Sequence, residues 1–299
     1  MKTIYADLHV HIGATTRGNP VKITASRGLV FGSIIRECLE RKGIDLVGIV
    51  DCASPGVLAD IKKLIKAGEL MELPEGGLLH RDRVTVILGS ELETVEENGG
   101  VSHMVGFFPF LSQIQEFSNL MSAYVTNMEL SSQRASLPAG ELYDVIRRCG
   151  GIMMPAHVFT PHKSVYGNAA DRMTDLLGEV DFETISVVEL GLSADTYIAD
   201  HLAELRNKTF LSNSDAHSLP KIAREYNVLQ VEKVNFREMI LAFNRSSGRK
   251  VIANYGMDPK LGKYHRSFCN NCQAVVDEPP PVLSCPRCGA LPPDFVRGV

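Results

Sequence analysis

The sequence has 299 residues, of which 44% are apolar, and its formal net charge at pH 7 is −4. This length fits one large α/β domain with a small appendage, or two ordinary domains, and the charge excludes a whole-molecule field that would attract nucleic acid. No apolar run has the length of a signal peptide or a membrane span, so we expect a cytoplasmic protein that does not enter a membrane.

The first predicted element is a strand over residues 5–13, where apolar and polar residues alternate. The two faces carry different residues, with Leu8, Val10 and Ile12 on one and Asp7, His9 and His11 on the other. The Cα atoms of the two histidines are expected to lie roughly 6.6 Å apart, so both imidazoles can reach one metal ion or two neighbouring ions. The pattern favours a metal site over the alternative of hydrogen-bonded core histidines.

After this strand the sequence alternates between apolar runs typical of buried strands and amphipathic stretches typical of helices. Helices are expected over residues 33–42, 57–70, 111–134, 139–149, 169–177, 195–205 and 236–244, and strands over 45–50, 84–94, 103–109, 150–156, 184–188, 209–213 and 227–231. The turn at 96–100 is too short for a helix, so a hairpin is expected to place Glu91 or Glu93 near His103. The loop over residues 14–27 either flanks a substrate cleft or is an ordinary surface loop. The order predicts an α/β fold, a distorted seven-stranded (β/α) barrel over residues 1–254.

Ionisable residues gather at the ends of the predicted strands, and the carboxyl ends of parallel barrel strands meet at one face. Imidazole and carboxylate ligands together suit zinc, manganese or iron. A bridging carboxylate such as Glu91 could hold two ions roughly 3.5–4 Å apart, a pair that activates water and stabilises the leaving oxygen of a phosphoester. The gathered residues are Asp7, His9, His11, Asp51, Glu91, His103, His157, Asp215 and His217.

Several candidates have a plausible structural role instead. Asp51 can cap a helix or orient a metal ligand, and Glu189 can be purely structural. In the loop after His157, His162, Lys163 and Tyr166 are candidate contacts for a substrate phosphate, although a solvated loop explains them equally well.

Residues 255–299 form a turn-rich linker followed by two Cys-x-x-Cys pairs that are separated by 12 residues. Four thiolates at this spacing predict one tetrahedral structural zinc ion, against the alternative of a redox dithiol. So small a segment has little core of its own, so zinc is expected to supply its folding energy. The predicted ligands are Cys269, Cys272, Cys285 and Cys288, whereas Cys38, Cys52 and Cys149 are expected to be buried free thiols.

The set Asp7-x-His9-x-His11, Glu91, His103, Ala156-His157 and Ser214-Asp-Ala-His217 resembles the polymerase and histidinol phosphatase (PHP) superfamily. The resemblance implies two or three divalent ions (zinc, manganese or magnesium) in the barrel and phosphoester hydrolysis, with Asp215, His157 and Glu91 as catalytic residues. It implies one ion held by His9, His11, Glu91 and Asp215, a second held by Glu91, His103 and His157, and a third site that uses His217. The sequence departs from this pattern at Asp51-Cys52, where many members have Asp-His. The third site therefore either uses Cys52 or is altered.

The barrel followed by Gly262-Lys-Tyr-His265 and the four cysteines resembles the endonuclease Q family, as do the stretches at 89–93 and 159–162. This resemblance implies damaged DNA as the partner, cut 5′ of deaminated bases (uracil, hypoxanthine, xanthine) or of abasic sites. Family members are expected to continue into a further C-terminal region, whereas this sequence ends soon after the second cysteine pair. Two other functions stay open, namely a small-molecule phosphatase of the PHP type and a non-catalytic zinc-ribbon binding protein.

Overall fold

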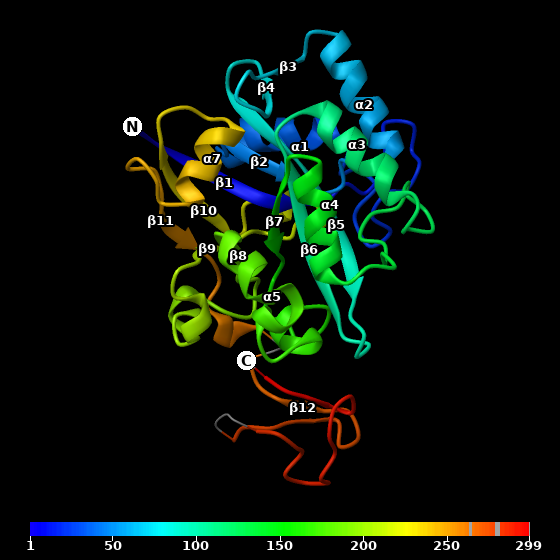
Figure 1. Cartoon of the computed structure of the whole chain (residues 1–299), viewed down its shortest axis with the longest axis vertical. Coiled ribbons are helices and arrows are strands. Elements are labelled where there is room, and N and C mark those ends of the chain that lie inside the picture. The colour runs from blue at the N-terminus through cyan, green and yellow to red at the C-terminus, as the bar shows by residue number, and fades with distance from the viewer. Residues whose placement is uncertain (263–264, 279–281, 299) are drawn as a thin grey trace.

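A mixed sheet of nine strands forms the frame of the protein, which is described here from a computed structural model over residues 1–262, 265–278 and 282–298 (Figure 1). The hydrogen-bonded order is β11-β10-β1-β2-β5-β4-β3, and β6 lies between β5 and β7. Strands β8 and β9 form a separate parallel pair, in which β8 contacts β7 and β9 contacts β11. The strands are β1 (Lys2–Val10), β2 (Leu46–Ile49), β3 (Leu70–Glu72), β4 (Leu78–His80), β5 (Val84–Val95), β6 (Val101–Phe108), β7 (Ile152–Pro155), β8 (Val187–Glu189), β9 (Thr209–Leu211), β10 (Tyr226–Val231) and β11 (Lys250–Tyr255).

The strands surround one apolar interior, and helices α1 to α5 cover their outer side. Side chains of β1, β2 and β5 to β10 form the interior cluster together with α7, and a second cluster lies between the strands and helices α1 to α5. The predicted α/β class is therefore confirmed, with β3, β4 and β11 as strands that the sequence pattern did not indicate. The helices are α1 (Phe31–Glu37), α2 (Pro55–Lys66), α3 (Leu111–Met121), α4 (Ala139–Arg148), α5 (Met173–Thr184), α6 (Thr196–Ala199) and α7 (Phe236–Phe243), with short turns η1 (Cys38–Lys42), η2 (Val165–Ala169), η3 (Ala203–Leu205), η4 (Leu219–Lys221) and η5 (Pro259–Leu261).

The register of β1 changes partway along the strand. Its pairing with β2 shifts between Asp7 and Val10. Because of this shift Leu8 packs in the interior cluster, whereas Val10 packs in the outer one. The predicted regular alternation is therefore wrong at this point, and Asp7 does not share the environment of the two histidines that follow it.

The predicted hairpin between residues 84 and 109 is confirmed. Strands β5 and β6 pair antiparallel, with Glu93 directly opposite His103 and Glu91 opposite Val105. This pairing places two carboxylates beside one imidazole.

The helix predicted over residues 111–134 is wrong beyond Met121, where α3 ends. The following segment is a loop that returns to the sheet, because the N–H of Ala135 donates to the carbonyl of Glu93 at 2.8 Å. Serine and asparagine are frequent in this segment, and their side chains compete with helical hydrogen bonds, as Asn127 does by accepting from the N–H of Glu129. The loop carries its residues to the end of the β5–β6 hairpin.

The C-terminal segment projects from the barrel at the lower end of the molecule in Figure 1. It contains β12 (Phe268–Cys269), β13 (Ala274–Val275) and β14 (Phe295–Val296), in the order β13-β12-β14. A cleft of about 650 Å³ separates it from the loop around His162 and Tyr166. Lys263 and Tyr264 of the predicted motif lie outside the described residues. In the described part of the chain, no helix combines the length and the apolar character that crossing a bilayer requires.

Candidate metal centre

Two groups of potential ligands meet at one end of the strands. The first contains His9 of β1, His11 just after it and Asp215 after β9. The second group consists of Glu91, His103 and His157, from β5, β6 and the end of β7. Within each group the ligand atoms lie within 4.8 Å of one another.

The Glu91 carboxylate lies between the two groups. Its Oε1 is 2.9 Å from Nδ1 of His103 and 3.5 Å from Nε2 of His157. The same oxygen is 3.4 Å from Nε2 of His9, and Oε2 is 3.5 Å from Nε2 of His11. Burial would raise the pKa of Glu91, but His103 and Lys22 hold it well below its ordinary value. A charged carboxylate in this position can bridge two ions.

The imidazoles carry buried nitrogen atoms whose chemistry fits a metal. Four of them have no hydrogen-bond partner in the described part of the chain. Leaving a buried polar atom unpaired costs roughly 1–3 kcal/mol, a cost that is removed when the lone pair binds a metal ion. Nitrogen ligands combined with carboxylates suit zinc or manganese. The four atoms are Nε2 of His9, Nε2 of His11, Nε2 of His103 and Nδ1 of His157.

Two buried carboxylates contact the Nδ1 atoms of the histidines in the first group. Both oxygens of Glu189 lie 3.0 Å from Nδ1 of His9, and Glu189 also accepts from the backbone N–H of His157 at 2.9 Å. Both oxygens of Asp51 lie 3.1 Å from Nδ1 of His11. Such partners fix the ring orientation and the tautomer, so that Nε2 faces the ion.

We expect Glu189→Gln to weaken metal binding by roughly 10–100-fold, because the amide keeps the shape but loses the charge that raises the basicity of His9. The measurement is metal retention during titration with a chelator. The matched control is Glu183→Gln, since Glu183 is an exposed carboxylate of α5. Equal retention in the two variants would contradict a supporting role for Glu189.

Three residues from the predicted set lie outside both groups. Asp7 accepts from the backbone N–H groups of Ser214 at 3.1 Å and Ala223 at 2.8 Å, and its burial raises its pKa to about 6. His217 lies against His11, with 4.7 Å between ring centroids, and its Nδ1 is 2.9 Å from the carbonyl oxygen of Asp215. Asp51 supports His11 as described above, which fits its alternative role as an orienting carboxylate.

The proposal that Cys52 ligates a metal ion is wrong. Its thiol donates to the carbonyl oxygen of Ile49 at 3.1 Å, and its side chain belongs to the outer apolar cluster. Burial raises the pKa of this thiol far above its ordinary value. Cys52 is one of the buried free thiols that the sequence predicted, together with Cys38 and Cys149.

The predicted substrate contacts lie at different distances from the centre. Lys163 is adjacent, because its Nζ is 2.8 Å from Oε2 of Glu93. His162 lines the cleft that faces the C-terminal segment. Tyr166 is held away from the centre, since its hydroxyl donates to Glu204 at 2.7 Å and its ring stacks on Phe159 at 5.2 Å.

Four further residues at the centre were not predicted from the sequence. Lys22 lies on the loop expected to flank a cleft, but no periodic pattern marked it. Ser131, Ser132 and Arg134 lie in the segment that was predicted to be helical. Ser131 donates to Asp51, Ser132 donates to Glu91, and Nε of Arg134 is 2.6 Å from Oε1 of Glu93.

Backbone strain also concentrates at this centre. Left-handed φ angles are uncommon for residues other than glycine and are often found at functional sites. They occur here at Asp215 (44°), Ser132 (49°) and Lys163 (55°), and φ is 33° at His157.

The four cysteines of the C-terminal segment converge on one point. Their sulfur atoms lie within 4.8 Å of one another, with 3.6 Å between Cys269 and Cys288 and 3.9 Å between Cys272 and Cys285. A tetrahedral zinc ion with Zn–S bonds of about 2.3 Å requires sulfur atoms about 3.8 Å apart. The geometry therefore fits the predicted zinc site.

Known proteins resemble this chain over its whole length, although no protein family model matches it. The uncharacterised protein YqxK of Bacillus subtilis (strain 168) is 45% identical over 302 residues, which cover 100% of this chain and 76% of YqxK. The crystal structure of the lesion-specific endonuclease PfuEndoQ from Pyrococcus furiosus matches with a TM-score of 0.81 and 31% identity, covering 99% of this chain and 70% of that chain. Endonuclease Q in complex with a 27-mer duplex substrate, with an abasic lesion at the active site, matches with the same values. The chain therefore belongs to the endonuclease Q family of phosphodiester hydrolases.

Proposed function

We propose that the protein is a metal-dependent repair endonuclease that hydrolyses the phosphodiester 5′ of deaminated bases (uracil, hypoxanthine or xanthine) or of abasic sites in DNA. The observation that carries this proposal is the pair of ligand groups joined by Glu91, with the unpartnered Nε2 atoms of His9 and His11 beside its carboxylate. It is supported by the endonuclease Q complex, which holds a duplex with an abasic lesion at its active site.

Two divalent ions (zinc, manganese or magnesium) are proposed for the barrel. His9, His11 and Asp215 would hold one, Glu91, His103 and His157 would hold the other, and Glu91 would bridge them. When bound, such ions polarise a phosphoryl oxygen and acidify water. The protein's own contribution is to fix the ligands in place, through Glu189 behind His9 and Asp51 behind His11.

One structural zinc ion is proposed for the four cysteines, at the end of the chain that faces His162 across the cleft. The thiolates would hold the segment in the shape that borders this cleft.

The damaged nucleotide has to leave the base stack before an enzyme can read it. Leaving the stack costs free energy, and a weakly paired or missing base lowers that cost. Residues 159–168 and the C-terminal segment supply the walls of a space that could accept it.

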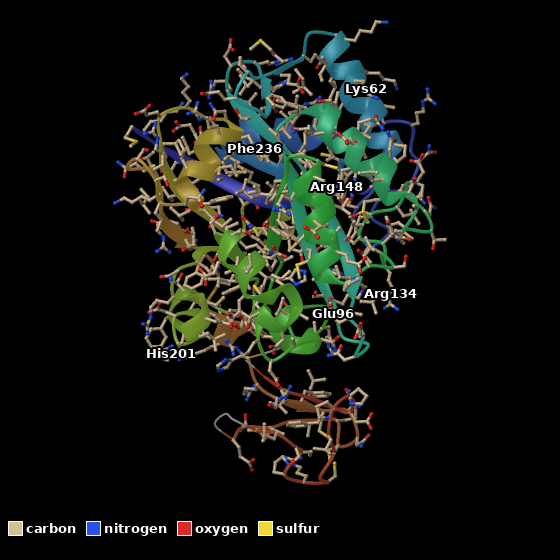
Figure 2. The ribbon with its side chains drawn as sticks, viewed as in Figure 1. Lys62, Glu96, Arg134, Arg148, His201 and Phe236 are labelled. Carbon is tan, nitrogen blue, oxygen red and sulfur yellow. The ribbon has the colours of Figure 1, made fainter. Side chains whose placement is uncertain are left out.

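Two exposed cations beside the second ligand group are proposed to contact the DNA backbone. Arg134 is 64% exposed and Lys163 is 53% exposed at the side chain, yet both are anchored on the buried carboxylate of Glu93. Figure 2 shows Arg134 projecting at the outer surface of the barrel. The imidazole of His103, whose Nε2 lies 3.6 Å from Oε2, lowers the pKa of Glu93, and Lys163 and Arg134 lower it further against the effect of burial, so the anchor stays charged. Cations held in this way can position a phosphate without reading the sequence.

The proposal is tested with end-labelled duplexes that carry one uracil, one hypoxanthine or one abasic site, together with an undamaged duplex, in Mg²⁺, Mn²⁺ and Zn²⁺. We expect a single cut 5′ of the lesion that is abolished by EDTA. Equal cleavage of the undamaged duplex would contradict lesion recognition. Rapid hydrolysis of a phosphomonoester with no cleavage of any duplex would instead select the phosphatase alternative.

A further inference from the structure

A lysine that the sequence pattern did not single out reaches the metal centre from the loop after β1. The side chain of Lys22 is only 13% exposed, and its Nζ lies 3.1 Å from Oε2 of Glu91. The ammonium also donates to Ser132, which itself donates to Glu91. The lysine therefore belongs to the centre and not to the surface of the loop.

The path of the backbone fixes this lysine in place. The N–H of Lys22 donates to the carbonyl of Ile12 at 2.8 Å, and the neighbouring Val21 accepts from the N–H of Ser131 at 3.0 Å. The loop packs tightly enough that a Cβ on Gly13 would lie 1.9 Å from the carbonyl oxygen of Ser26. The ammonium is thus held between the end of β1 and the loop after α3.

The two oxygens of Glu91 face different groups. Oε1 faces His103, His157 and His9, where the ligand groups lie. Oε2 faces His11 and the ammonium of Lys22. The Ser132 hydroxyl also donates to Oε2, so this oxygen is contacted by both the serine and the ammonium.

Carboxylates and an imidazole lie near Lys22. Burial would lower the pKa of Lys22, but the carboxylates of Glu91, Asp51 and Asp215 raise it above its ordinary value. The ring of His217 packs on His11 in the same region and belongs to neither ligand group. The described residues therefore surround the lysine with the kind of acidic environment that would otherwise attract a divalent ion.

We propose that the ammonium of Lys22 takes the place of a third divalent ion, so that the centre holds two metal ions and one built-in positive charge beside Glu91. This inference rests on the proposed metal-dependent activity. A lysine ammonium is a compact point charge with three donors, so it can offset the carboxylates and can also donate to a phosphate oxygen. Unlike a metal ion, it cannot dissociate.

The test counts metal ions bound to the 299-residue protein after loading with Mn²⁺, and zinc is counted separately because thiolates select zinc. Wild-type protein is expected to bind two Mn²⁺ per chain. Lys22→Ala removes both the charge and the bulk and is expected to bind one more, whereas Lys22→Met keeps most of the bulk and is expected to bind two. A third Mn²⁺ in the wild-type protein, or the same count in Lys22→Ala as in wild type, would overturn the proposal.

Cleavage kinetics test whether the positive charge of Lys22 contributes to catalysis. We expect Lys22→Met to lower kcat by at least tenfold with a smaller change in KM, and an unchanged kcat would overturn this part of the proposal. The control is Lys62→Met, because Lys62 is an exposed lysine of α2, which lies at the upper end of the molecule in Figure 2. If the wild-type protein cuts no damaged duplex, the proposed function fails, whereas the metal counts still decide the role of Lys22.

Discussion

Replacing Asp215 by asparagine is expected to lower the rate of DNA cleavage by roughly 10³-fold, the scale seen when a charge-stabilising group is lost from an active site. Asp215 is the carboxylate of the first ligand group, with Oδ1 3.2 Å from Nε2 of His11 and 3.7 Å from Nε2 of His9. Burial would raise its pKa, but His11 and His9 lower it well below its ordinary value, so the carboxylate is charged. The amide keeps the size of the side chain and removes that charge.

The fold is expected to survive this substitution. Asp215 has a φ of 44°, and asparagine tolerates this left-handed region as well as aspartate does. The measurement is kcat on the preferred damaged duplex, together with the melting temperature and the metal content. Asp200→Asn is the control, because Asp200 is an exposed residue at the end of α6. A wild-type kcat in Asp215→Asn would contradict a catalytic role for the Asp215 carboxylate.

Replacing Cys285 by serine is expected to release the zinc ion and unfold the C-terminal segment. The described apolar cluster of this segment has only Cys269, Val276, Cys285 and Phe295 as buried members, so the segment cannot be stable without the metal. Because the segment forms one wall of the cleft at His162, we also expect affinity for damaged duplex DNA to fall by at least tenfold. The barrel has its own core and should keep its melting transition.

Zinc content, limited proteolysis and DNA affinity measure the three parts of this prediction. The expected pattern is one zinc ion fewer per chain and new cleavage sites after residue 262, with the barrel resistant. Cys149→Ala is the matched control, because Cys149 is a buried thiol at the end of α4 and far from the zinc ligands in sequence. A full zinc content in Cys285→Ser would contradict the four-cysteine site.

The periodicity of the sequence predicted much of the centre because most of its ligands lie on regular strands or directly after them. The β5–β6 turn was short enough to imply that Glu91 and His103 would meet, and they do. Asp7 shows where this reasoning stops, since β1 changes register after it and its carboxylate lies outside the ligand group of His9. The alternation of apolar and polar residues cannot reveal such a shift, because the shift depends on how β1 pairs with β2.

Loop residues at the centre could not be predicted in the same way. Lys22 and Ser132 meet at Glu91 although 110 positions separate them, and neither belongs to a regular element. Their positions depend on tertiary hydrogen bonds, such as the one between Ser131 and Val21. The length of the segment after α3 suggested a longer helix, which hid the serines that support Asp51 and Glu91.

The pairing of β1 has a consequence for protein synthesis. One neighbour of β1 is β2, but the other is β10, and Asp7 binds the backbone of Ser214, which lies 207 positions later. A ribosome therefore has to release more than two thirds of the chain before Asp215 can join His9 and His11, and closing so long a loop is slow. A nascent chain that has not yet been extended to Asp215 consequently lacks one ligand of the first group and carries no assembled centre.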